Sequence, residues 1–503
     1  MAQADVAAGG KKKRKRAQMK ETLCKEDYQE WKLARKNRKM ERRMRETGAI
    51  HETHHHSDTY LEDSKLKSLP KEQIEQYMSS NSIAMSRNTL RPVIEFGFLP
   101  IPSKLQTFFS SYSKPTPVQA AAWPWALSGN DCVAIAETGS GKTLAFSIPA
   151  IKHVLQSQPK GIRVLILSPT RELALQIHAT VADLAQAVGL RAVCVYGGMS
   201  KLEQAKQLPR ANIVIATPGR LVDLMSDGSA DLSKVSYAVL DEADRMLDSG
   251  FEIEVRNIIG ALSSSRQTLM FTATWPQSVQ SLANTFMKNP IHIRIGENRE
   301  ELSANKSISQ TVHVIDSPSR EQHLLRILEQ EGAGGSNGAR ILIFALYKKE
   351  ASRVEQLLRR RRYRVAGIHG DLSQPQRTAA LDSFRQGSTP LLVATDVAAR
   401  GLDIPEVKLV INLTFPLTVE DYVHRIGRTG RAGQTGKAIT LFTELDKAHS
   451  GELINVLKRA DQTVPDELFK FGTTVKKKEH SSYGAFYKPI DTSVKATKVT
   501  FTE

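Results

Sequence analysis

Short runs of Val, Ile, Leu and Ala, each followed by a turn rich in Gly, Pro, Ser or Asp, recur between about residues 95 and 465. Stretches with the apolar spacing of amphipathic helices separate these runs. Continuous apolar strands that alternate with helices are typical of parallel sheets buried on both faces, so the pattern predicts an α/β fold. The predicted strands of the first series are 132–136, 163–167, 212–216, 235–240 and 268–272.

A second series of strands follows the polar stretch 296–307 and predicts a second domain. Its strands are 341–345, 363–368, 391–394, 409–413 and 438–442, and a Gly-rich loop at 332–338 precedes the first of them. We therefore predict two tandem α/β domains, 91–297 and 308–465. A basic, largely disordered N-terminal extension, 1–90, precedes them, and a basic C-terminal tail, 466–503, follows.

Composition agrees with a soluble globular body. The 503 residues are 40% hydrophobic and 24% charged, which excludes wholesale disorder and a collagen-like chain. No apolar stretch reaches 18 residues, so no membrane span is predicted, and the N-terminus has no apolar core of the secretory type. Three cysteines far apart in the sequence predict no disulfide framework and a reducing compartment.

The formal net charge of +17 is concentrated near the N-terminus, where residues 1–50 carry +9 and the other 453 carry +8. The Lys/Arg block 11–16 predicts a nuclear import signal that also contacts nucleic acid, and the alternative is a solvated tail. The histidines 51 and 54–56 form either a solvated run or a metal-binding tract. The arginines 359–362, at the end of a predicted amphipathic helix, are either an additional RNA contact or a solvated helix face.

A phosphate-binding loop is predicted directly after the strand 132–136. Its residues are Ala136, Glu137, Thr138, Gly139, Ser140, Gly141, Lys142 and Thr143. The two glycines let backbone N–H groups surround phosphate oxygens, Lys142 reaches the terminal phosphates and the Thr143 hydroxyl coordinates Mg²⁺. The alternative is a Gly-rich strand-to-helix turn with a solvated lysine.

Two adjacent carboxylates, Asp241 and Glu242, follow the buried strand 235–240, at the strand end where ligands of open parallel sheets collect. Asp241 can hold Mg²⁺ through water, and Glu242 can polarise an attacking water. An acidic helix N-terminus is the alternative, since carboxylates favour that end of the helix dipole.

The tetrapeptide Asp241-Glu242-Ala243-Asp244 resembles the namesake motif of the DEAD-box ATP-dependent RNA helicases of superfamily 2. The resemblance covers about residues 95–465 and implies two RecA-like domains that bind ATP, Mg²⁺ and RNA. Pro115-Thr116-Pro117-Val118-Gln119 resembles the family's Q motif, in which Gln119 would pair with the adenine edge. Phe96, or alternatively Phe98, would stack on adenine.

Further motifs of the family appear in order. Those that resemble its RNA-contacting motifs contain Pro169, Thr170, Arg171, Gly197, Gly198, Thr217, Pro218, Gly219 and Arg220 in the first domain and Gln374, Arg377 and Thr395 in the second. The resemblance gives a coupling role to Thr272, Thr274, Asp244 and His424, a ribose contact to Asp403 and arginine-finger roles to Arg428 and Arg431. Contacts of this kind hold phosphates without reading bases, so little sequence specificity is expected.

The runs 272–276, 344–351 and 483–488 resemble the fungal nucleolar members that assemble the large ribosomal subunit. This resemblance implies a monomer in the nucleus and nucleolus that acts on pre-rRNA, with ribosome assembly factors as possible partners and without a membrane partner. The alternatives are a helicase of mRNA metabolism or splicing, an ATP-gated RNA clamp or scaffold, and a DNA helicase, against which the 2′-hydroxyl would discriminate.

Overall fold

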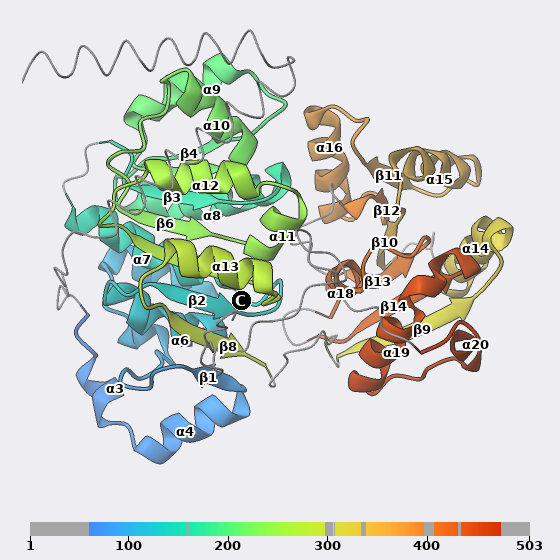
Figure 1. Ribbon diagram of the computed structural model, residues 1–503, viewed down its shortest axis with the longest axis horizontal. Coiled ribbons are helices and arrows are strands. Elements are labelled where there is room, and N and C mark those ends of the chain that lie inside the picture. Colours follow the sequence, from blue (N-terminus) through green and yellow to red (C-terminus); the bar gives the residue numbers. More distant parts are fainter. Residues whose placement is uncertain are drawn as a thin grey trace, which may run out of the picture.

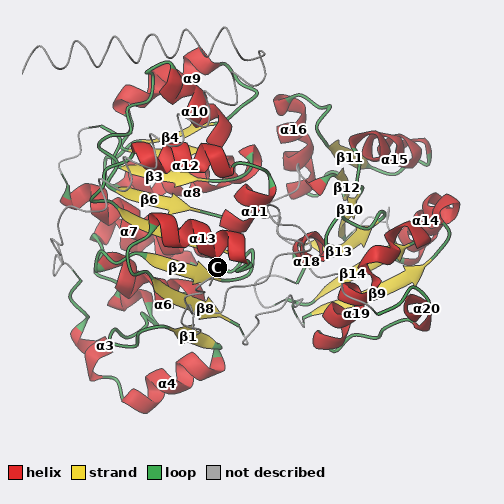
Figure 2. Cartoon of the chain, viewed as in Figure 1, coloured by secondary structure: helices red, strands yellow, loops and turns green. Residues whose placement is uncertain are grey.

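The computed structural model describes residues 60–157, 161–296, 305, 307–332, 339–396, 407–430 and 434–473. Two α/β domains lie side by side, and each consists of a sheet between layers of helices (Figures 1 and 2). The two-domain prediction and the α/β class are confirmed.

The sheet of the first domain has eight strands in the order β1-β8-β2-β7-β6-β3-β5-β4. All pairings are parallel except that of β1 with β8. The strands are β1 Ile83–Met85, β2 Cys132–Ile135, β3 Val164–Leu167, β4 Ala192–Val195, β5 Ile213–Ala216, β6 Tyr237–Leu240, β7 Gln267–Thr272 and β8 Ile291–Ile295.

Both faces of this sheet are buried because successive side chains of a strand point to opposite sides. Cys132 and Ala134 of β2 pack in one core with α6, α7 and α8, whereas Val133 packs in a second core with α10, α12 and α13. The helices are α3 Ser64–Ser68, α4 Lys71–Ser80, α5 Ser103–Gln106, α6 Pro117–Leu127, α7 Lys142–Gln156, α8 Arg171–Ala187, α9 Lys201–Gln207, α10 Pro218–Ser226, α11 Ala243–Asp248, α12 Glu252–Ala261 and α13 Gln277–Phe286. Short 3₁₀ helices span Phe96–Phe98, Thr107–Ser111 and Leu208–Arg210.

The sheet of the second domain has six strands in the order β11-β12-β10-β13-β14-β9, all parallel. They are β9 Ile308–Val314, β10 Arg340–Phe344, β11 Val365–Ile368, β12 Leu391–Ala394, β13 Val407–Asn412 and β14 Gly436–Phe442. Helices α14 and α15 cover one face, and α16, α18 and α19 the other. The helix bounds are α14 Arg320–Gln330, α15 Lys348–Arg360, α16 Gln374–Arg385, α18 Val419–Ile426, α19 Ser450–Arg459 and α20 Asp466–Phe469, and 3₁₀ turns span Ser317–Ser319 and Glu444–His449.

All ten predicted strands are present, with ends that differ by at most two residues. The strands β1, β4, β8 and β9 were not predicted. Side chains of β9 alternate between buried and exposed, and those of β8 also alternate over its first three residues. A strand near the edge of a sheet exposes one face to solvent, so polar residues interrupt its apolar run. A prediction that relies on continuous apolar runs therefore misses such strands.

The domain boundaries predicted from the sequence are too narrow at both ends. Residues 60–90 contain α3, α4 and β1, and their Leu66, Ile74 and Ile83 are buried in the core of the first domain. The predicted disorder up to residue 90 is therefore wrong for this segment. At the other end, Leu468 of α20 is buried against the second domain, so that domain continues beyond residue 465.

Several predictions lie outside the described residues. They include both basic tails before residue 60 and after residue 473, the histidine run 51–56, most of the loop 332–338, and the predicted site residues Asp403 and Arg431. In the part of the chain that is described, no helix has the length and apolar character needed to cross a membrane.

Candidate active site between the two domains

The phosphate-binding loop lies between β2 and α7, as predicted. Its glycines Gly139 and Gly141 adopt the left-handed φ values of 83° and 89°, which side chains disfavour. A Cβ atom on Gly141 would lie 2.6 Å from Nε2 of Gln119, so a side chain at this position would displace the Gln119 carboxamide. Lys142 opens α7 and its Nζ donates to the carbonyl of Ala136 at 3.0 Å. The loop is thus closed on itself at the N-terminus of a helix, where backbone N–H groups favour an anion.

Carboxylates crowd at the end of β6 beside this loop. Burial raises the pKa of Asp241 to about 7, with a further contribution from Glu242, although Lys142 opposes the shift. Glu242 has a left-handed φ of 50°, and its Oε2 is buried without a hydrogen-bond partner. A strained backbone and an unpaired buried oxygen are costly for stability, and such features cluster at functional sites.

These residues suit a divalent cation. Burial is the main cause of the raised pKa of Asp241, the neighbouring Glu242 adds to it, and a bound cation would favour the ionised carboxylate. Thr143 supplies a hydroxyl in the first turn of α7, and hard cations such as Mg²⁺ prefer oxygen ligands. Among the described residues no cluster of three or more His, Cys, Asp or Glu is arranged to hold a metal. The ion would therefore share its ligands with a bound nucleotide.

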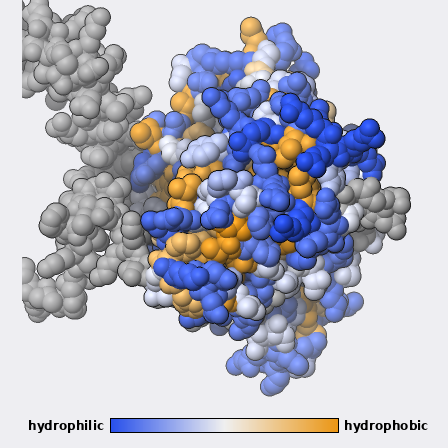
Figure 3. Space-filling view, turned by 90° about the vertical axis from the view of Figure 1, so that its right-hand side faces the viewer, coloured by the Kyte–Doolittle hydropathy of each residue, from blue (hydrophilic) through white to orange (hydrophobic). Residues whose placement is uncertain are grey.

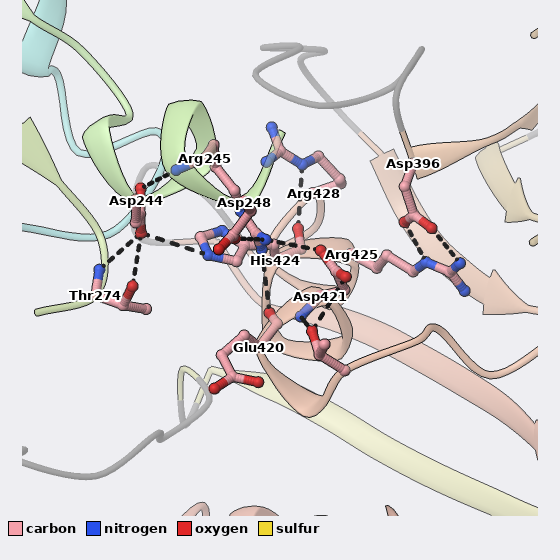
Figure 4. A network of polar contacts seen from close by, with 11 residues as sticks. Asp244, Arg245, Asp248, Thr274, Asp396, Glu420, Asp421, His424, Arg425 and Arg428 are labelled. Atoms are coloured by element: carbon pink, nitrogen blue, oxygen red, sulfur yellow. Dashed lines mark hydrogen bonds and ion pairs between the residues drawn. The ribbon is translucent and has the colours of Figure 1, made fainter. Parts of the chain in front are cut away.

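Asp244, Thr274 and His424, three of the residues predicted to couple hydrolysis to strand separation, lie together (Figure 4). Oδ2 of Asp244 accepts hydrogen bonds from the backbone N–H of Thr274 at 3.0 Å and from its hydroxyl at 2.8 Å. The Thr272 hydroxyl donates to the carbonyl of Thr274, and the Thr272 carbonyl accepts from Ala136 of the phosphate-binding loop. Nε2 of His424, from the second domain, lies 3.9 Å from Oδ2 of Asp244.

The turn that contains Arg428 faces the phosphate-binding loop. A Cβ atom on Gly427 would lie 3.7 Å from the hydroxyl of Thr138, which places this turn against the loop. Arg428 is buried and donates from Nε to the carbonyl of His424 at 3.1 Å (Figure 4). The neighbouring Arg425 has a different role, since it binds Asp396 through two hydrogen bonds of 2.6 and 2.7 Å inside the second domain.

An ion pair that was not predicted joins the domains beside this site. Nη1 of Arg245, on α11, lies 2.7 Å from Oδ1 of Asp421, on α18, and 2.8 Å from Oδ2 of Asp248 (Figure 4). The Arg245 side chain is only 2% exposed. The position of Arg245 directly after the tetrapeptide 241–244 could have indicated a functional role. Its partner Asp421 is 176 residues away, so no local sequence pattern indicates the pair.

The two phenylalanines predicted as alternatives for stacking on adenine differ in their accessibility. Phe98 is buried in the core of the first domain, whereas Phe96 lines a cavity of about 390 Å³ together with Phe109 and Tyr112. The ring of Phe96 stacks on that of Phe109 at 4.4 Å. Phe96 is therefore the phenylalanine that a ligand can reach.

Gln119 contacts the phosphate-binding loop directly. Its Nε2 donates to the carbonyl of Gly141 at 3.0 Å, and its Oε1 accepts from the backbone N–H of Thr116. The carboxamide thus has a protein partner at each end, which the comparison with the Q motif did not predict. It retains one N–H and one lone pair for another ligand.

The predicted RNA-binding residues of the first domain meet at the carboxyl ends of β3, β4 and β5. Arg171 lies against Gly197 and Gly198, where a Cβ atom on Gly198 would come within 2.5 Å of its Nη1. Both terminal nitrogens of Arg220 donate to the carbonyl of Met199 at 3.1 Å. Thr170 and Thr217 cap the N-termini of α8 and α10, next to Pro169, Pro218 and Gly219.

The predicted RNA-binding residues of the second domain are placed differently from the expectation. Gln374 and Arg377, on α16, are buried and both bind Glu172 of the first domain, at 3.2 and 2.7 Å. Glu172 was not predicted as a site residue, although it lies next to Arg171. Thr395 is buried at the end of β12 and donates its N–H to Ile368. Gln374 and Arg377 thus bind the first domain, whereas the backbone contact of Thr395 stays within the second domain.

The described geometry agrees with comparisons to known proteins. Residues 116–282 match the family model of the DEAD/DEAH box helicase, and residues 319–433 match that of the helicase conserved C-terminal domain. The "ATP-dependent RNA helicase dbp3" of Sclerotinia sclerotiorum is 58% identical over 457 residues, which cover 88% of this chain and 76% of that protein. The "ATP-dependent RNA helicase DBP3" of Saccharomyces cerevisiae is 56% identical over 88% of this chain and 86% of its own length.

Two solved structures have the same fold. A structure of Mss116p bound to single-stranded RNA and AMP-PNP is 29% identical, with a TM-score of 0.66 over 77% of this chain and 83% of that one. A structure of Saccharomyces cerevisiae Dbp5 bound to RNA and ADP BeF3 is 26% identical, with a TM-score of 0.62 over 76% of this chain and 94% of that one. The chain belongs to the DEAD/DEAH box helicases, in the branch of ATP-dependent RNA helicases.

Proposed function

We propose that ATP is hydrolysed between the phosphate-binding loop and the turn at Arg428, and that closure of the two domains completes this site. The supporting observation is that Gly427 of the second domain lies against Thr138 of the loop. In this proposal Glu242 accepts a proton from the attacking water while the bond from the γ-phosphorus to the ADP oxygen breaks. Arg428, together with Arg431, stabilises the charge that develops on the γ-phosphoryl group.

Thr143 and Asp241 would hold Mg²⁺, Asp241 through water. Bound there, the ion would neutralise phosphate charge and orient the terminal phosphates. Lys142 would hold the β- and γ-phosphates, while the backbone amides of residues 136–141 surround them. Phe96 would stack on adenine, Gln119 would hydrogen-bond to its edge, and Asp403 would contact the ribose.

RNA would lie across the edges of both domains that carry these motifs. Arg171, Arg220 and the Gly197–Gly198 turn would hold its phosphates on the first domain, and Thr395 on the second. RNA and ATP that both favour the closed arrangement must each raise the affinity for the other. A strand bent in this closed state no longer fits a duplex, which gives local unwinding or remodelling.

We further propose that the natural substrate is precursor ribosomal RNA in the nucleolus. The resemblance of 272–276, 344–351 and 483–488 to fungal nucleolar helicases supports this substrate. The Lys/Arg block 11–16 supports nuclear import. Specific targeting would come from the tails and from assembly factors, since phosphate contacts in the body carry no base information.

Crosslinking of the protein to RNA in cells, followed by sequencing, tests this substrate. Mature rRNA is an abundant contaminant, so the informative reads are those in spacer sequences that are absent from finished ribosomes. We expect enrichment on these spacers for the wild type and a marked loss for the double variant Arg171→Ala/Arg220→Ala. The matched control is Arg256→Ala, since Arg256 lies on α12 and pairs with Glu252 away from the motifs.

Enrichment on introns or on mature mRNA instead would favour the splicing or mRNA alternative. Spacer reads that are equal for the wild type and the Arg171/Arg220 variant would contradict the proposed contact surface. An ATP-gated clamp would crosslink to the same sites. It differs from a turning-over helicase because Glu242→Gln would leave its cellular role intact.

A further inference from the structure

We propose that the second domain has a second RNA-binding surface at the edge of its sheet opposite the motifs. Six arginines form this surface, and we call it the arginine edge: Arg340, Arg360, Arg361, Arg362, Arg364 and Arg385. Its ligand is the phosphate backbone of RNA that continues from the strand held in the cleft. None of the family-like motifs contains these residues.

The strand register brings these arginines to one edge. Leu391 of β12 pairs with Ile341 of β10 on one side and with Val365 of β11 on the other. The three strands are parallel, so Arg340 and Arg364, each at the start of its strand or just before it, lie at the same level. Helix α15 ends at Arg360 and leads through Arg361–Arg364 into β11.

Two contacts connect the turn before β12 to the same edge. Nη1 of Arg364 donates to the carbonyl of Ser388 at 3.3 Å, and Nη2 of Arg340 lies 3.8 Å from the position of a Cβ atom on Gly387. This turn directly follows α16, which ends at Arg385. The six arginines therefore come from three segments of the chain, at 340, 360–364 and 385, and form one surface.

Three of the six arginines, at the end of α15, carry charge that no ion pair offsets within the described residues. Glu355 is bound to Arg359, at 2.5 Å, and Glu331 is bound to Lys437. Arg360, Arg361 and Arg362 are all exposed and, among the described residues, none of the three has an ion-pair partner. Like charges held together repel each other unless an anion neutralises them.

The backbone of Arg362 supports a role in binding. The N–H of Arg362 donates to the carbonyl of Arg359, and that of Tyr363 to Leu358, which closes the end of α15. At this left-handed position, with a φ of 65°, glycine is the usual residue. Arginine is strained there, so the fold alone does not favour it. A ligand that needs the charge accounts for its presence.

RNA fits this surface better than an acidic protein does. Protein interfaces have an apolar core, but the large apolar side chains that are exposed in the described residues all lie outside this edge. The outward face of the second domain carries a group of strongly hydrophilic atoms in its upper half, at the height of α15 in Figure 1 (Figure 3). Arginine also pairs with phosphate in a two-pronged geometry.

The arginine edge is separate from the cleft. The predicted RNA contact Thr395 follows the carboxyl end of β12, whereas Arg340 and Arg364 lie at the amino ends of its neighbours. Strands of four or five residues, at about 3.3 Å per residue, separate the two edges by roughly 13–17 Å. A short single strand in the cleft therefore does not reach the arginine edge, but a longer structured RNA does.

Binding of two RNAs tests the proposal. One is a ten-nucleotide single strand and the other is the same strand extended by a hairpin, both measured with a non-hydrolysable ATP analogue over a range of salt concentrations. The triple variant Arg360→Gln/Arg361→Gln/Arg362→Gln should bind the hairpin RNA about tenfold more weakly. Its slope of log affinity against log salt should fall by about 2, and its affinity for the short strand should change less than twofold.

The control removes the same formal charge from the first domain by Lys65→Gln/Lys67→Gln/Lys71→Gln. Loss of the same size in this control, equal loss for the short strand, or no loss in the arginine triple variant would each overturn the proposal. Arg362→Gly separates binding from folding, because glycine relieves the backbone strain. It should raise the melting temperature by about 2 °C while it weakens binding of the hairpin RNA. A lower melting temperature with unchanged binding would show that Arg362 is merely structural.

Discussion

The two domains share one architecture but contribute opposite charges to the cleft between them. The first supplies the buried carboxylates Glu172, Asp241, Glu242 and Asp244, and the second faces them with the guanidinium groups of Arg377 and Arg428. In the first domain this negative charge has a cost, as the raised pKa of Asp241 shows. The buried carboxylates of the first domain thus find their cationic partners in the second domain. In the proposed mechanism, closure of the domains and completion of the site are therefore the same event.

One pair reverses this arrangement. Arg245 of the first domain binds Asp421 of the second, and this ion pair is almost completely buried. Removal of one partner of a buried ion pair leaves an unpaired buried charge, which lowers stability more than the removal of both partners does. The reversed pair fixes how the domains meet, and it gives a way to weaken closure without altering the predicted catalytic groups.

The largest expected effect is at the turn that the second domain places against the loop. Arg428→Ala should reduce RNA-stimulated ATP hydrolysis by about 10³-fold or more, because an arginine finger acts on charge that develops in the transition state. Binding of a fluorescent ATP analogue should change far less. Steady-state hydrolysis and analogue titration, with Arg256→Ala as the control, measure the two effects. Equal losses in binding and in turnover would assign Arg428 to general binding.

The second largest effect is expected at Glu242 of the first domain. Glu242→Gln should reduce hydrolysis by about 10²–10⁴-fold, since the amide cannot accept a proton from water. The variant should still bind RNA in the presence of ATP and release it more slowly than the wild type. Hydrolysis assays and RNA dissociation rates, with the exposed Glu252→Gln as control, measure both. Unchanged turnover would remove Glu242 from the proposed mechanism.

The reversed ion pair should have an intermediate effect. Asp421→Asn leaves the Arg245 guanidinium partly unpaired between the domains, so closure should be weaker and the apparent affinity for RNA with ATP analogue about tenfold lower. The double variant Arg245→Met/Asp421→Asn, which removes both charges, should lose less affinity than the sum of the losses of Arg245→Met and Asp421→Asn measured singly. Additive losses would show that the pair does not act across the cleft.

The smallest effect concerns pH. Asp241 has a folded-state pKa of about 7, above its ordinary value, so the folded protein holds this proton more tightly than the unfolded chain does. The stabilisation is complete below the unfolded pKa and is lost as the pH rises through about 7. Without ligand, Asp241→Asn should therefore melt at a higher temperature than the wild type at pH 8, and the gap should narrow toward pH 6. A gap that is constant with pH would contradict the assignment of that pKa.

Much of the fold is predictable from the sequence because buried parallel strands are continuous apolar runs. The runs at 132–136 and 391–394 are examples. The strands β8 and β9 are not predictable in this way, since polar residues interrupt them where one face meets solvent. Residues 60–90 resemble a polar extension, and the few apolar side chains that dock on the first domain become evident only in three dimensions.

The candidate site likewise has parts that are predictable from the sequence and parts that are not. The loop at Gly141 and the carboxylates at Asp241 are local patterns whose chemistry depends on neighbours in the chain. The pairings of Glu172 with Arg377 and of Arg245 with Asp421 join residues far apart in the sequence, which no local pattern contains. The choice between Phe96 and Phe98 likewise depends on which ring the core buries.

The central claim is that ATP and RNA are linked through closure of two incomplete half-sites. It is tested most directly by measuring the affinity for a ten-nucleotide RNA with and without a non-hydrolysable ATP analogue, and the affinity for the analogue with and without that RNA. We predict that each ligand raises the affinity for the other by the same factor, of about tenfold or more, and that Asp421→Asn reduces both factors together. Affinities that are independent of the other ligand would contradict the account.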